Sequence, residues 1–123
     1  FPIFRLADAY LMYAELAAKG VGSKATARGY INTLRTRANA AAITSDADVT
    51  LDFVLDERAR ELYWEGHRRQ DLIRNNKFSG STKLWQWKGN SLNGASIDAK
   101  YNLYPIPQTE LNTNSNLTQN AGY

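Results

Sequence analysis

The sequence predicts an all-α fold: a tetratricopeptide-like helix pair, a long third helix and a loop-rich C-terminal region. Apolar residues recur at helical spacing in three stretches, about residues 3–19, 24–40 and 51–76. Residues 79–102 are instead rich in Gly, Ser and Asn, the composition of a long loop. Since 123 residues suffice for one domain with a real core, we expect a single domain over residues 1–123.

Composition narrows the functional classes. Hydrophobic residues make up 43% and charged residues 22%, as in globular proteins. The net charge is +3, but basic residues alternate with acidic ones, whereas a nucleic-acid site needs a one-sided basic stripe. The absence of cysteine excludes disulfides, thiol catalysis and thiolate metal sites. The chain begins within an amphipathic pattern, without Met or a signal-type segment, so we expect a piece of a longer protein with any targeting signal upstream.

The first two helices are expected to pair. The first has its apolar stripe at Leu6, Tyr10, Tyr13, Ala14 and Ala17. Gly20 ends this helix and Ser23 caps the next, whose stripe is Ala27, Tyr30, Ile31, Leu34 and Ala38. A single unit of this length cannot bury its own apolar face. We therefore expect exposed apolar surface on helix 3–19, and dimerisation of a fragment that lacks its neighbours.

The third helix, 51–76, is predicted to begin at the N-cap Thr50, with Asp52 in its first turn. Its buried side comprises Leu51, Val54, Leu55, Arg58, Leu62 and Ile73. Gly66 interrupts this helix, which costs stability unless another backbone approaches there. After the surface loop 79–102, two closely spaced prolines in YPIPQ predict an extended tail over 103–123 that excludes a helix.

The charged segment within 51–76 admits a catalytic, a metal-binding or a structural interpretation. Glu61 and Glu65 lie one turn apart, but both project from one helix among arginines that would keep them ionised, so neither is a proton donor. His67 has no Glu three residues before it, as a helical di-iron site requires, and the chain has no second His. No Ser stands on a strand-to-helix elbow to form a triad with it. Neither a catalytic nor a metal site is expected.

The remaining interpretation is a structural ion network of Arg58, Glu61, Glu65, Arg68 and Asp71. The two glutamates repel each other unless an arginine bridges them. Arg58 is one candidate for the bridge, and Arg35 or Arg37 from the second helix are the others. A partly buried network of this kind fixes how helices dock more than it adds stability.

Four segments in order resemble motifs of the C-terminal part of the SusD/RagB family of outer-membrane nutrient-binding lipoproteins. FRLADAYLMYAE (4–15) is similar to the family's Arg-x-Ala-Asp/Glu helix, and YINTLRTRA (30–38) to its Asn-x-hydrophobic-Arg-x-Arg-Ala helix. LDERARELYWEGHRRQDLIR (55–74) resembles its charged central string, and LYPIPQTEL with LTQNAGY (103–123) its ending. One departure is that Arg69 and Gln70 stand where members often carry an aromatic pair.

The resemblance implies a helical binding protein, not an enzyme, without a cofactor. Its parent would be lipid-anchored at the cell surface of the outer membrane, and would capture oligosaccharides, or sometimes peptides, for a partner TonB-dependent transporter (SusC-like). The resemblance also implies that the glycan site is built largely from loops upstream of this chain. Glu61, Gly66, His67 and Asp71 would then have scaffold roles.

One stretch, KLWQWKGN (83–90), has the ingredients of a ligand site. Sugars stack on aromatic faces while polar groups bind their hydroxyls. If the stretch is extended, Trp85 and Trp87 share a face. Trp85, Trp87, Lys88 and Asn90 are therefore the predicted ligand-binding residues, and the alternative is that both tryptophans cover the core.

Three functional hypotheses follow. The leading one is a glycan-binding module of a SusD-like lipoprotein. The alternative is a scaffolding, protein-interacting helical segment without a ligand site of its own. A glycoside hydrolase ranks third, and substitutions of Glu61 and Glu65 would separate it from a scaffold by loss of turnover in a folded protein.

Overall fold

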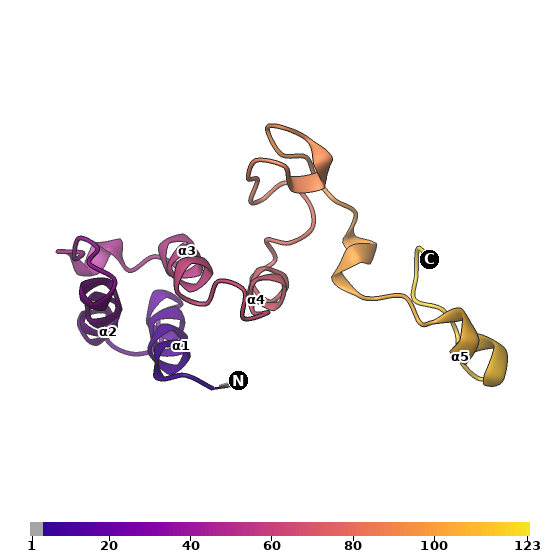
Figure 1. Cartoon of the computed structure of the whole chain (residues 1–123), viewed down its shortest axis with the longest axis horizontal. Helices are drawn as coiled ribbons and strands as arrows, with labels where there is room; N and C mark the ends of the chain where they lie inside the picture. The colour runs from indigo at the N-terminus through magenta and orange to yellow at the C-terminus, as the bar shows by residue number, and fades with distance from the viewer. Residues whose placement is uncertain (1–3) are drawn as a thin grey trace. The chain divides into compact units, whose positions relative to one another are not determined.

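A computed structural model describes residues 4–123, and its regular structure in this range is helical, as predicted. The α-helices are α1 (Leu6–Ala18), α2 (Lys24–Arg37), α3 (Leu51–Glu61), α4 (Arg68–Arg74) and α5 (Gln108–Thr113) (Figure 1). Three 3-10 turns lie at Asp46–Asp48, Lys88–Asn90 and Ala99–Asn102. The chain divides into two compact units, residues 1–68 and 69–123, of which the first is described from residue 4.

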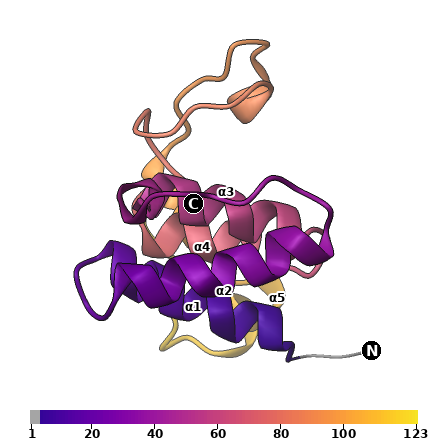
Figure 2. The same ribbon diagram turned by 90° about the vertical axis from the view of Figure 1, so that its left-hand side faces the viewer.

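In the first unit, α1 packs against both α2 and α3 (Figure 2). The contact between α1 and α2 includes a stack of Tyr10 on Tyr30, with ring centroids 4.5 Å apart, and an edge contact of Tyr13 with the same ring at 5.3 Å. The Tyr13 hydroxyl also accepts a hydrogen bond from the Ser23 amide in the connecting loop, at 3.2 Å. The predicted helix pair is thus present, while its tetratricopeptide-like character stays a prediction.

Two predicted helix caps are confirmed. The Ser23 side chain accepts a hydrogen bond from the Thr26 amide before α2, and the Thr50 side chain accepts one from the Phe53 amide before α3, both at 3.2 Å. These bonds satisfy amides that have no partner inside the helix. Helix starts are therefore the features that the sequence located best.

The predicted buried face of α1 was partly wrong. Leu6 is 66% exposed, whereas Leu11, absent from the predicted stripe, is buried. The buried line instead runs through Ala7, Leu11 and Ala14 at i, i+4 and i+7. The small alanine side chains allow neighbouring helices to pack closely. The outer face exposes apolar side chains, as expected for helix 3–19; on α1 these are Leu6, Met12 and Leu16. Dimerisation through this face stays a prediction.

The prediction of one continuous helix over 51–76 was wrong, because a turn separates α3 from α4. Trp64 and Gly66 both adopt left-handed backbone, with φ of 64° and 80°. Two such residues within three positions cannot continue a right-handed helix. A Cβ at Gly66 would meet nothing within 4 Å, so this glycine serves the turn and not the close backbone approach considered from the sequence. The predicted buried residues Val54, Leu55, Arg58 and Leu62 are nevertheless buried.

Two other predictions were wrong, the end of the second helix and the absence of a helix in the tail, and the start of the first helix is partly outside the described residues. Helix α2 ends at Arg37 instead of residue 40, since Asn39 has a φ of 55° and the Ala40 amide turns back to the Arg35 carbonyl. The predicted start of the first helix at residue 3 lies outside the described residues, and Arg5 is the extended N-cap of α1. The tail does contain a helix, α5, because Pro107 forms its N-cap and so precedes the helix without breaking it.

We expect Gly66→Ala to destabilise the first unit by about 1–2 kcal/mol, because Ala at a positive φ pays for its Cβ. Gly29→Ala is the matched control: Gly29 lies within α2 without a positive φ, and nothing lies within 4 Å of an added Cβ. That substitution should stabilise by up to about 1 kcal/mol. Urea unfolding of the chain measures both. Equal effects of the two substitutions would contradict the role of Gly66 in the turn.

Candidate functional site

The ion network predicted from the sequence separates into distinct pairs. An arginine does bridge Glu61 and Glu65, but it is Arg5, which the sequence analysis did not name. Its guanidinium contacts Glu61 Oε1 at 2.9 Å and both carboxylate oxygens of Glu65, at 2.7 and 2.9 Å. It also donates to the Glu61 carbonyl at 2.8 Å, at the last turn of α3. Arg5 therefore closes the end of α3 as well as pairing its charges.

A second ion pair joins α3 to α1. Arg58 of α3 lies 2.8 Å from the Asp8 carboxylate of α1, and Arg58 is only 2% exposed. From α2, Arg35 pairs with Glu57, and Arg37 pairs with Glu61. Helix α3 is therefore tied by ion pairs to both α1 and α2.

The other two predicted members lie apart from these pairs. Arg68 donates to the Leu55 carbonyl at 2.8 Å and lies 3.6 Å from Asp56. Asp71 is buried and pairs with Arg74 within α4, at 2.9 Å. The five residues named from the sequence are thus distributed over four sets of contacts.

The electrostatics of Glu65 oppose a role in acid catalysis. The hydrogen bonds from Arg5 hold the pKa of the Glu65 carboxyl below its ordinary value, and the same contacts raise the pKa of Arg5. A glycosidase acid needs the opposite shift. In the described part of the chain, no group of three or more His, Cys, Asp or Glu side chains is placed to hold a metal ion.

The tryptophan loop, residues 83–90, is a turn and not an extended strand. Trp87 has a φ of 68°, and its amide donates to the Ser91 carbonyl at 2.9 Å. Both tryptophans are exposed, Trp85 by 38% and Trp87 by 65%, and Asn90 is exposed as well. The tryptophans therefore do not act as fully buried core residues.

Lys88, the fourth predicted ligand residue, is buried beneath this loop. It is 3% exposed, and its ammonium donates to the carbonyls of Lys83 at 2.7 Å, Gly80 at 3.0 Å and Lys77 at 3.4 Å. It also lies 4.8 Å from the centroid of the Trp85 ring. Burial lowers the pKa of the Lys88 ammonium. The structure thus gives Lys88 a supporting role inside the loop.

A glycine completes the support of the tryptophan loop. Gly94 has a φ of 78°, and a Cβ there would lie 2.5 Å from the Trp85 carbonyl oxygen. The Ala95 amide next to it donates to the Lys88 carbonyl at 2.8 Å. The close approach at Gly94 was not recognisable from the sequence, because Gly94 meets the Trp85 backbone only after the turn at Trp87 forms.

None of the helices in residues 4–123 combines the length and the apolar character needed to cross a lipid bilayer. This finding concerns the described helices alone.

The sequence matches the SusD family over residues 1–123. It is 47% identical over 122 residues to the starch-binding protein SusD of Bacteroides thetaiotaomicron, covering 99% of this chain and 21% of that protein. It is 43% identical over 77 residues to the SusD-like protein P25 of Formosa agariphila, covering 58% of this chain and 14% of that protein. The chain thus spans about a fifth, or less, of the length of these relatives.

Solved structures agree with these matches. A SusD superfamily protein from Bacteroides vulgatus superposes with a TM-score of 0.76 at 35% identity, covering 98% of this chain and 27% of that one. The surface glycan-binding protein A from Bacteroides uniformis gives a TM-score of 0.73 at 33% identity, covering 97% and 27%.

The Arg5 bridge predicts a pH effect. The lowered pKa of Glu65 means that its ion pair contributes stability above the ordinary glutamate pKa, about 4.3, and that this contribution is lost as the pH falls through the lower folded value. We expect Arg5→Gln to raise the pKa of Glu65 towards its ordinary value. A carbon-13 NMR titration of the Glu65 carboxyl measures both midpoints. The same midpoint in the two proteins would show that Arg5 does not set it.

The Lys88 contacts predict a local effect. Lys88→Met keeps the length of the side chain but leaves the Gly80 and Lys83 carbonyls without their donor, so local opening should become easier by about 1–3 kcal/mol. Hydrogen exchange of the Trp87 and Ala95 amides reports it. Gln86→Met, an exposed position in the same loop, is the control and should leave exchange unchanged. Equal protection in both variants would remove the supporting role of Lys88.

Proposed function

The chain belongs to the SusD family, and we propose that it is part of a cell-surface lipoprotein of the outer membrane that captures oligosaccharides for import through a TonB-dependent transporter. The observation that carries the proposal is the 47% identity, over nearly the whole chain, to a protein named for starch binding. A structural neighbour is likewise named for glycan binding. Family membership also supports a binding protein and not an enzyme.

Within this proposal, the two units have different roles. The first unit is a scaffold, because the charged residues of the family-like strings pair with one another inside this unit. The second unit offers the tryptophan loop as a contact for sugar. Trp85 and Trp87 supply exposed aromatic faces and Asn90 an amide, while Lys88 holds the loop from within.

The alternative, a scaffold segment without a ligand site of its own, is favoured by one observation. The ion pairs of α1, α2 and α3 use the charged residues that a ligand would otherwise meet. Under this alternative the whole glycan site lies in the remaining length of a SusD-like protein.

Native gel electrophoresis through amylopectin, dextran or xylan tests the proposal. The full native protein that contains this chain should be retarded by at least one polysaccharide. Trp85→Ala with Trp87→Ala should weaken the retardation, because each lost ring contact is worth on the order of 1 kcal/mol. The control is Tyr63→Ala with Trp64→Ala, which removes a more exposed aromatic pair from the first unit and should change nothing.

The outcomes separate the two hypotheses. Retardation that survives the double tryptophan substitution supports the scaffold alternative, with the glycan site elsewhere in the protein. No retardation of the full protein by any polysaccharide would contradict glycan capture itself.

A further inference from the structure

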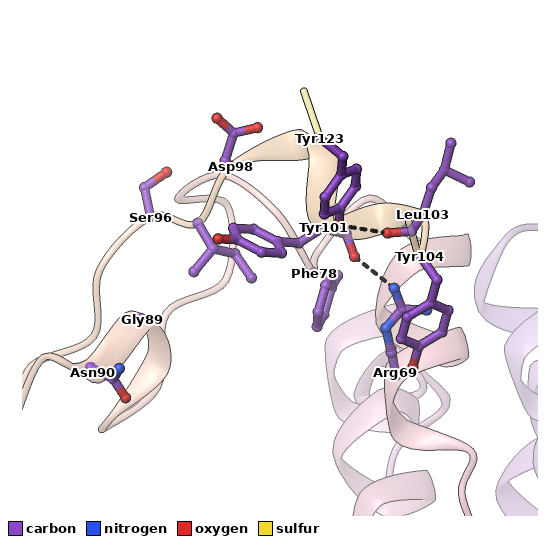
Figure 3. Close-up of a pocket in the computed structure, with 11 residues that line it drawn as sticks. Arg69, Phe78, Gly89, Asn90, Ser96, Asp98, Tyr101, Leu103, Tyr104 and Tyr123 are labelled. Carbon is purple, nitrogen blue, oxygen red and sulfur yellow. Dashed lines mark hydrogen bonds between the residues drawn. The ribbon is translucent and has the colours of Figure 1, made fainter. Parts of the chain in front are cut away.

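The second unit contains a pocket that the predicted ligand residues do not explain. Its volume is about 550 Å³, within the range of small-molecule sites. Segments far apart in the sequence supply its lining: the start of α4, the 3-10 turns at 88–90 and 99–102, and the tail (Figure 3). Of the four residues named from the sequence as ligand contacts, Asn90 alone lines it.

Tyrosines form one wall of this pocket. The rings of Tyr101 and Tyr123 meet edge to face, with centroids 6.4 Å apart and an interplanar angle of 87°. The Tyr123 hydroxyl donates to the Leu103 carbonyl at 2.9 Å, which fixes the ring (Figure 3). Both residues remain partly exposed, by 48% and 43%. The wall is therefore held in place and still accessible.

A fixed arginine lies beside this wall. The Arg69 guanidinium is 4.0 Å from the Tyr104 ring centroid and 5.2 Å from that of Phe78, and it donates to the Tyr101 carbonyl at 2.6 Å (Figure 3). These contacts hold the guanidinium in one position before any ligand arrives. A preorganised donor beside aromatic rings is suited to a ligand with both apolar faces and hydroxyl groups.

Small polar groups lie on the other side of the pocket. Asn90, Ser96 and Asp98 line it, and Asp98 accepts a hydrogen bond from the Lys100 amide at 2.8 Å. The charged residues of the lining are one carboxylate and one guanidinium, Asp98 and Arg69. An anionic ligand would meet the carboxylate and a cationic ligand the guanidinium, so the balanced lining favours a neutral, hydroxylated molecule.

We propose that this pocket binds a short neutral saccharide, at a subsite separate from the tryptophan loop. The ligand rests an apolar ring face on Tyr101 beside the Tyr123 ring, while Asp98, Asn90 and Arg69 take its hydroxyl groups. In its choice of a sugar the inference rests on the proposed function. The choice of a neutral ligand rests on the charged side chains that line the pocket.

Calorimetric titration of the chain with maltoheptaose and with cellohexaose, an α-linked and a β-linked neutral probe, tests this subsite. At least one should bind saturably. Tyr101→Ala should weaken it about tenfold by removing a stacking face. Ser96→Trp should abolish it by filling the pocket from an exposed position. Tyr63→Ala with Trp64→Ala, an exposed aromatic pair of the first unit, is the control and should leave this binding unchanged.

Three results would overturn the inference: no binding of either saccharide, binding that Ser96→Trp leaves intact, or tighter binding of trigalacturonic acid or a tripeptide. The first two leave the proposed function standing wherever the full protein is still retarded by polysaccharide. No retardation of the full protein, together with maltoheptaose binding that Ser96→Trp abolishes, would instead be a failure of the proposed glycan capture alone. Circular dichroism of Ser96→Trp confirms that the blocked chain is folded.

Discussion

The first unit depends on two sets of ion pairs between α1 and α3. Arg5, the N-cap of α1, pairs with Glu61 at the end of α3 and with Glu65 just beyond it, and Asp8 of α1 pairs with Arg58 of α3. Each side thus presents charges of both signs to the other. Arg58 and Asp8 are nearly buried, and a buried charge is costly unless its partner is in place. A shift of α1 along α3 by one turn would bring like charges together, so these pairs select one register for the interface.

The sequence allowed α1, α2 and α3, the N-caps of α2 and α3 and most of the α3 core to be predicted, because these depend on local spacing and on side-chain oxygens three residues from the amides they cap. It did not reveal Arg5 as the bridge, since the partners are 56 and 60 residues away and only the packing of α1 on α3 brings them together. The break after α3 was missed for a related reason. Gly66 was noticed, but left-handed backbone is uncommon for a bulky residue, so Trp64 gave no sign of the turn.

These contacts explain the charged residues of the family-like strings. The Arg-x-Ala-Asp string of α1 pairs with α3 through both of its charges. In the α2 string, Asn32 holds the Ile43 backbone through its amide and carbonyl groups, and Arg35 and Arg37 reach Glu57 and Glu61. Each of the three helical strings therefore carries counter-charges of another. From the residues alone, a catalytic and a structural interpretation of the glutamates differ only in their partners, and partners are what a single sequence does not display.

The second unit is organised by a different principle, which bears on recognition. Within residues 69–123, the buried side chains include the charged Asp71 and Lys88 beside Leu72, and fixed polar contacts connect its loops. Lys88 joins three carbonyls, and the Gln119 amide pairs with both backbone groups of Ile106. A unit built in this way does not need its aromatic rings for a core. Its tryptophans and tyrosines stay at the surface on backbone that hydrogen bonds already hold, and rigid exposed rings bind a ligand at a smaller cost in conformational entropy than mobile ones. Under the proposed function, the loop-rich sequence that looks least structured supplies the surface for recognition, and the strongly patterned helices of the first unit form the scaffold.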